Sequence, residues 1–208
     1  MRVLIADNHE LMRQGLKHVV AATIANVSIM EVDTLARALD KVKRTTWDLV
    51  LLDFWFPDGS GLAILAEMKA RGLPYPTLVV SIHEEADYAL RSLKAGAKGY
   101  IAKDAPIDEL AHAVKLVIEG GEYLPSSLVG VQYNTQHSLD RPPHGALGER
   151  EFQVFAMTCR GMTVKNIASA LELSPKTVNN VRRKILKKLG LSSTNALIKY
   201  GVQHRIGA

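Results

Sequence analysis

The stretch Trp47-Asp-Leu-Val-Leu-Leu-Asp53-Phe-Trp-Phe-Pro57-Asp-Gly-Ser-Gly61 decides the fold. Its apolar run, Leu49 to Leu52, is too short for a helix and is typical of a strand buried on both faces, as in parallel sheets. Asp53 falls where that strand should end, and the proline and glycines after it predict a loop. Because ligands of open α/β sheets bind outside the carboxyl ends of the strands, Asp53 is a candidate nucleophile or metal ligand. Taken alone, it would more often be a helix cap or a loop residue.

Strand-like and helix-like segments alternate along residues 1–120. We expect strands at Val3–Ala6, Val27–Val32, Leu49–Leu52, Pro76–Ile82 and Gly99–Ala102, and helices at His9–Val20, Leu35–Val42, Leu62–Met68, Ala86–Ala95 and Ile107–Ile118. Five such units in a row predict a doubly wound, flavodoxin-like α/β domain. Its five-stranded parallel sheet would have the order 2-1-3-4-5, with helices on both faces.

A second, all-α domain is expected after a polar linker. Helices are predicted at Glu149–Cys159, Thr163–Leu171, Ser174–Leu189, and from Ser193 or Thr194 to about His204. Ser174 followed by Pro175 is a typical helix start, and Gly190 is a typical stop. The predicted organisation is therefore a first domain at 1–121, a linker at 122–145 and a four-helix domain at 146–208. His137 and His144 fall in this linker and are interpreted as solvated histidines rather than metal ligands.

Charge divides the chain unevenly. Residues 147–208 contain 11 Lys and Arg against 3 Asp and Glu, whereas residues 1–146 contain 15 against 18. A basic second half predicts binding to nucleic acid by that half alone. No apolar run approaches the roughly 18 residues that span a membrane, and because an acid comes as early as Asp7 we do not expect a signal peptide. A single cysteine, Cys159, cannot form an internal disulfide, which favours a reducing cytoplasm and a small buried apolar role.

Four other polar features follow predicted strands, as Asp53 does. Asp7 and Asn8 come after the first strand, Ser81 ends the fourth, and Lys103 follows the fifth. In the predicted strand order these ends meet in one crevice. The combination suits phosphoryl transfer to the Asp53 carboxylate, because Mg²⁺ held by acidic oxygens, a hydroxyl and an ammonium group would together neutralise the phosphoryl oxygens.

Residues 1–120 resemble a receiver domain of two-component signalling, and the whole chain resembles a response regulator of the NarL/FixJ class. The resemblance rests on Asp7-Asn8-His9, Asp53 with Pro57 and Gly61, Ser81, and Tyr100-Ile-Ala-Lys103. It implies a sensor histidine kinase as partner and a phosphoryl group on Asp53. It further implies a phosphate-binding Lys103, a switch formed by Ser81 and Tyr100, and Mg²⁺ held by Asp7, Asn8, Asp53 and the backbone carbonyl of Trp55.

The sequence departs from this family at Asn8. Receivers of this kind usually carry a second acid there, and an amide oxygen can ligate Mg²⁺ but brings no charge. We therefore expect weaker Mg²⁺ binding and slower phosphorylation. Two alternatives stay open, a weakened but functional site and a pseudo-receiver that regulates without phosphate. Phe56 stands where Met or Leu is usual, which is a change of packing only.

The helix at Ser174–Leu189 has two distinct faces. An apolar stripe recurs at helical spacing and is predicted to be buried: Val178, Val181, Ile185 and Leu189. The other face is basic. A short helix, a tight turn and a basic helix are the pattern of a helix-turn-helix, whose second helix enters the major groove of double-stranded DNA.

The same half resembles a LuxR-type domain over nearly its full length. The matching segments are Leu147–Phe152, Gly161–Ala168, Leu173–Val178 and Lys188–Leu191. By position, the resemblance implies base contacts from Asn179, Asn180 and Arg183, and phosphate contacts from Lys176, Thr177, Arg182, Lys184, Lys187 and Lys188. Gly148 and Val181 replace the family's usual Thr and His, which affects local capping and one backbone contact.

These features predict a cytoplasmic transcription regulator that acts as a homodimer, since two helix-turn-helix units read two half-sites. Two other classes are weighed against it. An aspartyl-phosphate hydrolase would need an acid where Trp55 stands, so the chain is not expected to be an enzyme beyond its own phosphorylation and dephosphorylation. An RNA-binding or purely protein-binding output would be identified by its failure to prefer DNA.

Overall fold

The computed structural model describes residues 1–73, 75–82, 86–125, 143–204 and 206. The chain divides into two units, residues 1–133 and 134–208, each with its own packed interior. The predicted linker at 122–145 includes residues 126–142, which lie outside the described part, so its bounds stay a prediction. Among the described residues, no helix combines the length and the apolar character needed to cross a bilayer.

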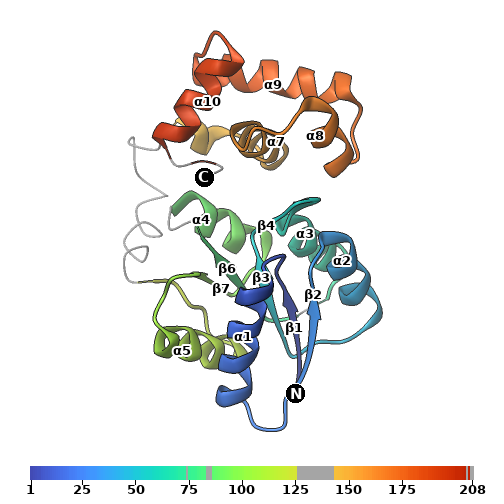
Figure 1. Ribbon diagram of the computed structural model, residues 1–208, viewed down its shortest axis with the longest axis vertical. Helices are drawn as coiled ribbons and strands as arrows, with labels where there is room; N and C mark the ends of the chain where they lie inside the picture. Colours follow the sequence, from blue (N-terminus) through green and yellow to red (C-terminus); the bar gives the residue numbers. More distant parts are fainter. Residues whose placement is uncertain (74, 83–85, 126–142, 205, 207–208) are drawn as a thin grey trace. The chain divides into compact units, whose positions relative to one another are not determined.

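The first unit is built on a five-stranded parallel sheet (Figure 1). Its strands are β1 (Arg2–Ala6), β2 (Ser28–Val32), β3 (Leu49–Asp53), β6 (Thr77–Ser81) and β7 (Gly99–Ala102). Their order in the sheet is β2-β1-β3-β6-β7, which confirms the predicted 2-1-3-4-5 topology. Every residue of the central strand β3 is buried, as its unbroken apolar run indicated.

In the described part of this unit, five helices cover the two faces of the sheet (Figure 1). α1 (Glu10–Thr23) and α5 (Ile107–Ile118) pack together on one face, while α2 (Leu35–Arg44), α3 (Leu62–Ala70) and α4 (Ala86–Ala95) lie on the other. The apolar face of α1 buries Leu16, Val19 and Val20 against the sheet. A sheet covered in this way leaves the carboxyl ends of its strands as the open edge where polar side chains can gather.

The segment after Asp53 is more ordered than the predicted loop. β4 (Trp55–Phe56) and β5 (Gly59–Ser60) pair as a small antiparallel hairpin. Asp58 at its tip accepts hydrogen bonds from the backbone N–H groups of Leu35 and Ala36, at 3.0 and 3.1 Å, and so caps the start of α2. Gly61 is required here, because a Cβ on it would collide with the Asp53 carbonyl oxygen. The hairpin is therefore fixed at both ends.

The second unit is helical throughout its described part. A 3₁₀ turn, η1 (Pro143–Ala146), leads into α7 (Glu149–Cys159), α8 (Val164–Ala170), α9 (Pro175–Leu189) and α10 (Thr194–Gln203). The side chains of Thr163, Ser174 and Ser193 cap three of these helices by accepting backbone hydrogen bonds. Gly190 ends α9 in the left-handed conformation at a φ of 65°, as expected.

The interior of this unit is made by α9 lying across α7 and α8. Val178 and Ile185 of the predicted apolar stripe are fully buried, while Val181 and Leu189 are half-buried at its margins. Cys159 is half-buried, and burial raises the pKa of its thiol to about 12.

The interpretation of His144 as a solvated linker residue is wrong. Its side chain is buried in η1, and its Nδ1 lies 2.9 Å from the Tyr200 hydroxyl of α10. The rings of Phe155, Tyr200 and His204 surround it. Burial and the neighbouring His144 lower the pKa of His204. Residues 143–146 thus belong to the helical unit, with His144 and Gly145 in its interior. His137 falls outside the described residues.

Candidate functional site

The strand ends bring the predicted polar residues of the first unit together. β3 ends at Asp53, which pairs in register with Val80, so Ser81 is the next residue along β6. Ser81 pairs in turn with Ala102 of β7, and the backbone N–H of Lys103 donates to the Ser81 carbonyl at 2.7 Å. Asp7 follows β1, the strand on the other side of β3. The predicted crevice is present.

At its centre, the Lys103 ammonium group lies between two carboxylates. Lys103 Nζ is 2.8 Å from Asp53 Oδ2 and 2.6 Å from Asp7 Oδ2. The three side chains are only 6%, 5% and 1% exposed, respectively. Two carboxylates so close together are compatible with burial because the ammonium charge lies between them.

These surroundings change the acidity of Asp53. Its pKa is raised to about 6, first by burial and then by the negative charge of Asp7. The charge and hydrogen bond of Lys103 and the backbone N–H of Trp55 oppose this rise, the latter at 3.3 Å from Asp53 Oδ1. At neutral pH the carboxyl group is therefore mostly ionised, the state that a nucleophile requires, but it is held in an unfavourable environment.

Asn8 occupies the crevice as a hydrogen-bond donor. With its amide nitrogen directed inward, it donates to Asp53 Oδ2 and to the Trp55 carbonyl, both at 3.1 Å. Both of these groups belong to the expected metal-binding set. A second carboxylate at this position could not donate and would repel Asp53, so the amide suits the metal-free site. To ligate a metal, Asn8 would have to present its oxygen instead.

The remaining donors fit a divalent cation. Asp7, His9 and Asp53 each offer one ligand atom, and these atoms all lie within 4.8 Å of one another. The His9 backbone N–H donates to Asp7 Oδ1 at 2.8 Å, which holds the turn after β1 against the crevice. Sequence reasoning did not include His9 in the metal set, although it directly follows Asp7-Asn8.

The two predicted switch residues are both in the interior. Ser81 is 1% exposed at the end of β6, and the ring of Tyr100 is fully buried beside it on β7. Tyr88 of α4 is also fully buried and packs edge-on against Phe54, with ring centroids 4.8 Å apart. In this structure Tyr100 is therefore already turned inward.

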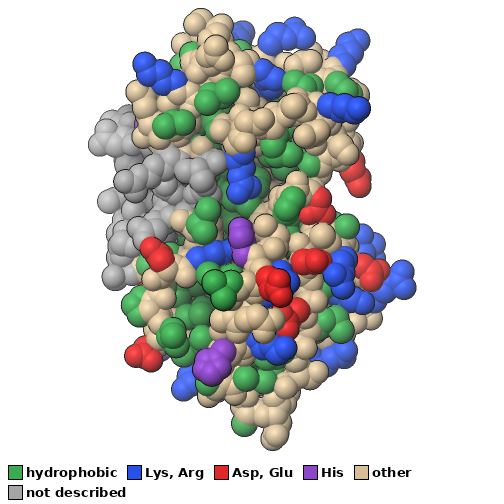
Figure 2. Space-filling view, viewed as in Figure 1, with side chains coloured by type: hydrophobic (Ala, Val, Ile, Leu, Met, Phe, Trp, Pro, Cys, Tyr) green, Lys and Arg blue, Asp and Glu red, His purple; other side chains and the backbone are tan. Residues whose placement is uncertain are grey.

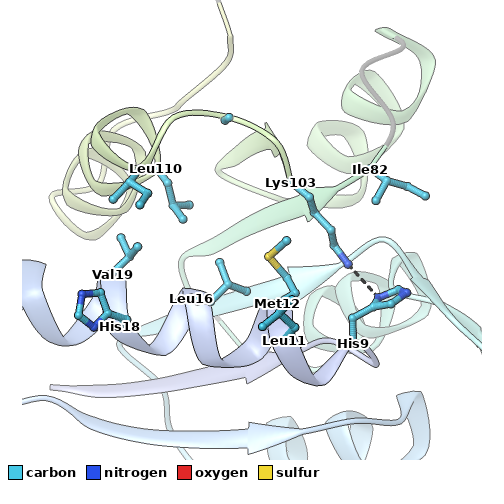
Figure 3. Close-up of a pocket in the computed structure, with 12 residues that line it drawn as sticks. His9, Leu11, Met12, Leu16, His18, Val19, Ile82, Lys103 and Leu110 are labelled. Carbon is cyan, nitrogen blue, oxygen red and sulfur yellow. Dashed lines mark hydrogen bonds between the residues drawn. The ribbon is translucent and has the colours of Figure 1, made fainter.

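An apolar pocket that the sequence did not indicate lies beside the crevice (Figure 3). It has a volume of about 630 Å³ and runs between α1 and the segment that leads into α5, with His9 and Lys103 at one end. Leu11 at its edge is 88% exposed and Ile107 is 67% exposed. Both are large apolar residues in the first turn of a helix. Their presence in the sequence at these two positions could have predicted an apolar surface that no other part of the unit covers.

In the second unit, α8 and α9 form a helix-turn-helix. α9 carries most of the predicted DNA-contacting residues on its exposed surface: Lys176, Asn179, Asn180, Arg183, Lys184, Lys187 and Lys188. Lys and Arg side chains are prominent along the rim of this unit in Figure 2, whereas acidic and basic side chains mix on the first unit. The two remaining residues of the set, Thr177 and Arg182, are half-buried.

Some of these side chains already have partners. Arg183 Nη2 donates to Asn180 Oδ1 at 2.5 Å, so two predicted base readers hold each other on one surface. Arg182 donates to the Thr194 hydroxyl of α10, and Lys188 pairs with Glu151 of α7 at 2.6 Å. A phosphate contact from Arg182 or Lys188 would have to compete with these internal bonds.

The substitution at Gly148 removes only half of a helix cap. Glu151 Oε2 accepts a hydrogen bond from the Gly148 backbone N–H at 2.8 Å, as in a capping box. The second bond of a capping box, from the Glu151 backbone N–H to a side-chain oxygen of the first capping residue, is missing because glycine has no side chain. The start of α7 is thus retained with weaker capping.

Two protein families match this chain. Residues 3–115 match the family described as "Response regulator receiver domain", and residues 145–200 match "Bacterial regulatory proteins, luxR family". The first match covers more than half of the chain, and the two together account for both units.

Individual relatives are similar over nearly the whole length. The chain is 31% identical to "Response regulator GacA" of Pseudomonas viridiflava over 206 residues, which is 98% of this chain and 96% of that protein. It is 30% identical to the "Fimbriae Z protein" of Salmonella typhimurium over 98% of this chain and 97% of that protein. It is 27% identical to "Response regulator UvrY" of Escherichia coli over 98% and 94%, respectively.

Solved structures support the fold. The response regulator RcsB of Salmonella enterica serovar Typhimurium, bound to promoter P1flhDC in the presence of phosphomimetic BeF3-, superimposes with a TM-score of 0.74 at 20% identity, covering 96% of this chain and 97% of that one. The same protein bound to promoter rprA gives the same values.

Proposed function

Since the chain is a response regulator of the NarL/FixJ class, in which a receiver domain precedes a luxR-family DNA-binding domain, we propose that phosphorylation of Asp53 switches its binding to DNA. One observation carries this proposal. Asp53 is a buried, ionisable carboxylate that ends the central strand and contacts the Lys103 ammonium group at 2.8 Å. The domain bounds proposed with it are 1–121 for the receiver, 122–145 for the linker and 146–208 for the DNA-binding domain, although residues 143–145 at the end of this linker pack in the η1 turn of the helical unit.

The chemistry follows from the side chains of the crevice. A sensor histidine kinase presents a phosphohistidine, whose P–N bond breaks as an Asp53 carboxylate oxygen forms a new bond to phosphorus. Lys103 lies close enough to neutralise the transferred oxygens, and the Ser81 hydroxyl at the neighbouring strand end can donate to one of them. A bound Mg²⁺, held by Asp7, Asp53, the Trp55 carbonyl and a reoriented Asn8, would supply further positive charge.

The switch starts from the ion pairs of Lys103. A phosphoryl group adds negative charge to Asp53, whose Oδ2 lies 2.8 Å from the Lys103 ammonium group, and this ammonium group also contacts Asp7. Lys103 and Ser81 are joined through the backbone hydrogen bond between β7 and β6, so a shift of one is passed to the other. Tyr100, whose ring is already buried, would stabilise the shifted position of the β6 and β7 strand ends.

The output is recognition of double-stranded DNA by α9 in the major groove. Asn179, Asn180 and Arg183 would read base edges, and the surrounding lysines, with Thr177 and Arg182, would contact phosphates. The related RcsB structures are described as complexes with promoter DNA, and one as two dimers on two DNAs, which supports DNA and a second copy as partners here. A homodimer would read two half-sites.

This function needs no activity on any other substrate. We infer that the chain acts in the cytoplasm, where DNA and the kinase's catalytic part are found, and that it catalyses only its own phosphorylation and dephosphorylation. Within the described site, nothing favours the alternative of a receiver that signals without phosphate, because the nucleophile, the lysine and the hydroxyl are all in place.

Intact-mass measurement tests the proposal. The full chain is incubated with acetyl phosphate and Mg²⁺ beside the Asp53→Asn variant. We expect the parent to gain the mass of one phosphoryl group and the variant to gain none. A parent that stays unmodified over a wide range of Mg²⁺ concentration, or a variant that is modified equally, contradicts phosphorylation of Asp53.

A further inference from the structure

The Lys103 ammonium group lies at the acidic centre of the crevice, next to His9. Its nitrogen lies 2.6 Å from Asp7 Oδ2, 2.8 Å from Asp53 Oδ2 and 3.3 Å from His9 Nδ1. Figure 3 shows the His9 ring and the Lys103 side chain directed at each other across this end of the pocket. Nδ1 therefore has a donor, the ammonium group, on one side and an acceptor, the Asp7 carboxylate at 3.1 Å, on the other, and its unprotonated form is the one in which imidazole binds metals.

His9 also faces the carboxylate of Asp7. Its Nδ1 is 3.1 Å from Asp7 Oδ1 and 3.8 Å from Asp53 Oδ2. Ligand atoms bound to one transition ion at about 2.0–2.2 Å lie roughly 3–3.5 Å apart, so the His9–Asp7 spacing suits a shared ion. The His9 side chain is 58% exposed, which leaves a path for an ion from solvent.

We propose that His9 Nδ1 is a metal ligand, so that the crevice, with Asp7 and Asp53, prefers a divalent transition ion of the Zn²⁺ and Co²⁺ class to Mg²⁺. The proposal deepens the proposed function, on which it rests for the location of the metal site. It concerns the identity of the ion, whereas phosphorylation concerns the carboxylate of Asp53.

The donor set explains the preference. Mg²⁺ favours charged oxygen ligands, and this site has lost one because Asn8 provides an amide whose nitrogen now faces Asp53 and the Trp55 carbonyl. Imidazole nitrogen is a good ligand for Zn²⁺, Co²⁺ and Ni²⁺ and a poor one for Mg²⁺. The chain therefore loses Mg²⁺ affinity on the side of Asn8 and gains transition-metal affinity on the side of His9.

Metal titration of the tag-free full chain tests this assignment, with Co²⁺, Zn²⁺ and Mg²⁺ as the probes. Binding is followed by calorimetry, and for Co²⁺ also by its visible absorption, which reports nitrogen ligation directly. His9→Ala is the test variant. His18→Ala is the matched control, because His18 is an exposed histidine of α1, the helix that directly follows His9, and is not part of the cluster.

A higher affinity for Zn²⁺ than for Mg²⁺ is expected at almost any carboxylate site, so the effect of the variants decides. We expect His9→Ala to weaken Co²⁺ and Zn²⁺ binding by more than about tenfold and to change Mg²⁺ binding by less than about twofold. We expect the Co²⁺ absorption to change with His9→Ala and to stay unchanged with His18→Ala.

Other outcomes overturn the assignment. If His9→Ala lowers the affinities for Mg²⁺ and Co²⁺ equally, His9 stabilises the site without ligating the ion. If neither affinity falls, His9 is not a ligand. Loss in His18→Ala would place the ion on the surface of α1. Intact mass after acetyl phosphate treatment in Mg²⁺ is read separately, so a chain that binds Co²⁺ through His9 but takes no phosphoryl group refutes the switch and leaves this proposal standing.

Discussion

Replacing Asp53 by Asn should stabilise the receiver unit at neutral pH. The pKa of this carboxyl is raised from 3.8 to about 6, mainly by burial and by the charge of Asp7. A pKa that is higher in the folded than in the unfolded chain means that the ionised group destabilises the fold at pH values above both. Each pKa unit corresponds to about 1.4 kcal/mol, so the full effect is about 3 kcal/mol at pH 7.5.

The pH dependence follows from the same linkage. Below pH 6 the folded parent becomes protonated at Asp53, so the destabilisation by its charge decreases and is lost once the pH falls below 3.8, where the unfolded chain is protonated too. The stability gain of Asp53→Asn should therefore be close to its full value at pH 7.5, fall between about pH 6 and pH 4, reach about half near pH 5, and be lost below the unfolded pKa of 3.8. Lys103 keeps Asp7 as a partner in the variant, at 2.6 Å, so the change leaves no unpaired ammonium group.

Urea unfolding in EDTA, followed by tryptophan fluorescence, measures this gain. Both tryptophans, Trp47 and Trp55, lie in the first unit and are buried, so the signal reports that unit alone. The exposed Asp104→Asn variant is the control and should change the free energy of unfolding by less than about 0.5 kcal/mol. An Asp53→Asn variant that is less stable than the parent at pH 7.5, or equally more stable at pH 5, would refute the reasoning.

Three further predictions can be checked independently. Asn8→Asp should raise Mg²⁺ affinity by about tenfold or more, because it restores a charged oxygen ligand, and unchanged binding in a fluorescence titration would contradict this. Arg183→Ala should weaken binding to a selected DNA by about 1–3 kcal/mol and relax the sequence preference of the chain. Lys187→Ala should instead weaken binding to all DNA sequences alike and reduce the salt dependence of that binding. Anisotropy titrations at several salt concentrations separate the two effects. The Cys159 thiol, whose pKa burial raises to about 12, should react with a thiol reagent at pH 8 only after unfolding, and fast reaction of the native chain would count against its burial.

The architecture was predictable because its signals are local. The buried run at Leu49–Leu52 and the cap at Ser174–Pro175 each act within a few residues, and the structure reproduces both. The strand order followed from the resemblance and from the alternation of strands and helices. The same order brought Asp7, Asp53 and Lys103 into one crevice.

Features that depend on distant partners were missed or misread. His144 is buried only because Tyr200, 56 residues away in the chain, meets its ring, and nothing in the polar segment around it indicates this contact. The donor role of Asn8 depends on the positions of Asp53 and the Trp55 carbonyl. The expected loop after Asp53 is a hairpin because Asp58 binds the start of α2, more than 20 residues earlier in the chain.

DNA affinity before and after phosphorylation tests the central claim most directly. A fragment selected from a random pool by the purified chain is titrated with the parent and with Asp53→Asn, each with and without acetyl phosphate and Mg²⁺. We predict that the treatment raises the parent's affinity by about 5- to 150-fold, the range of ordinary coupling between sites, and leaves Asp53→Asn unchanged. An equal response of both proteins, or none in a parent whose mass confirms phosphorylation, would contradict a switch that acts through Asp53.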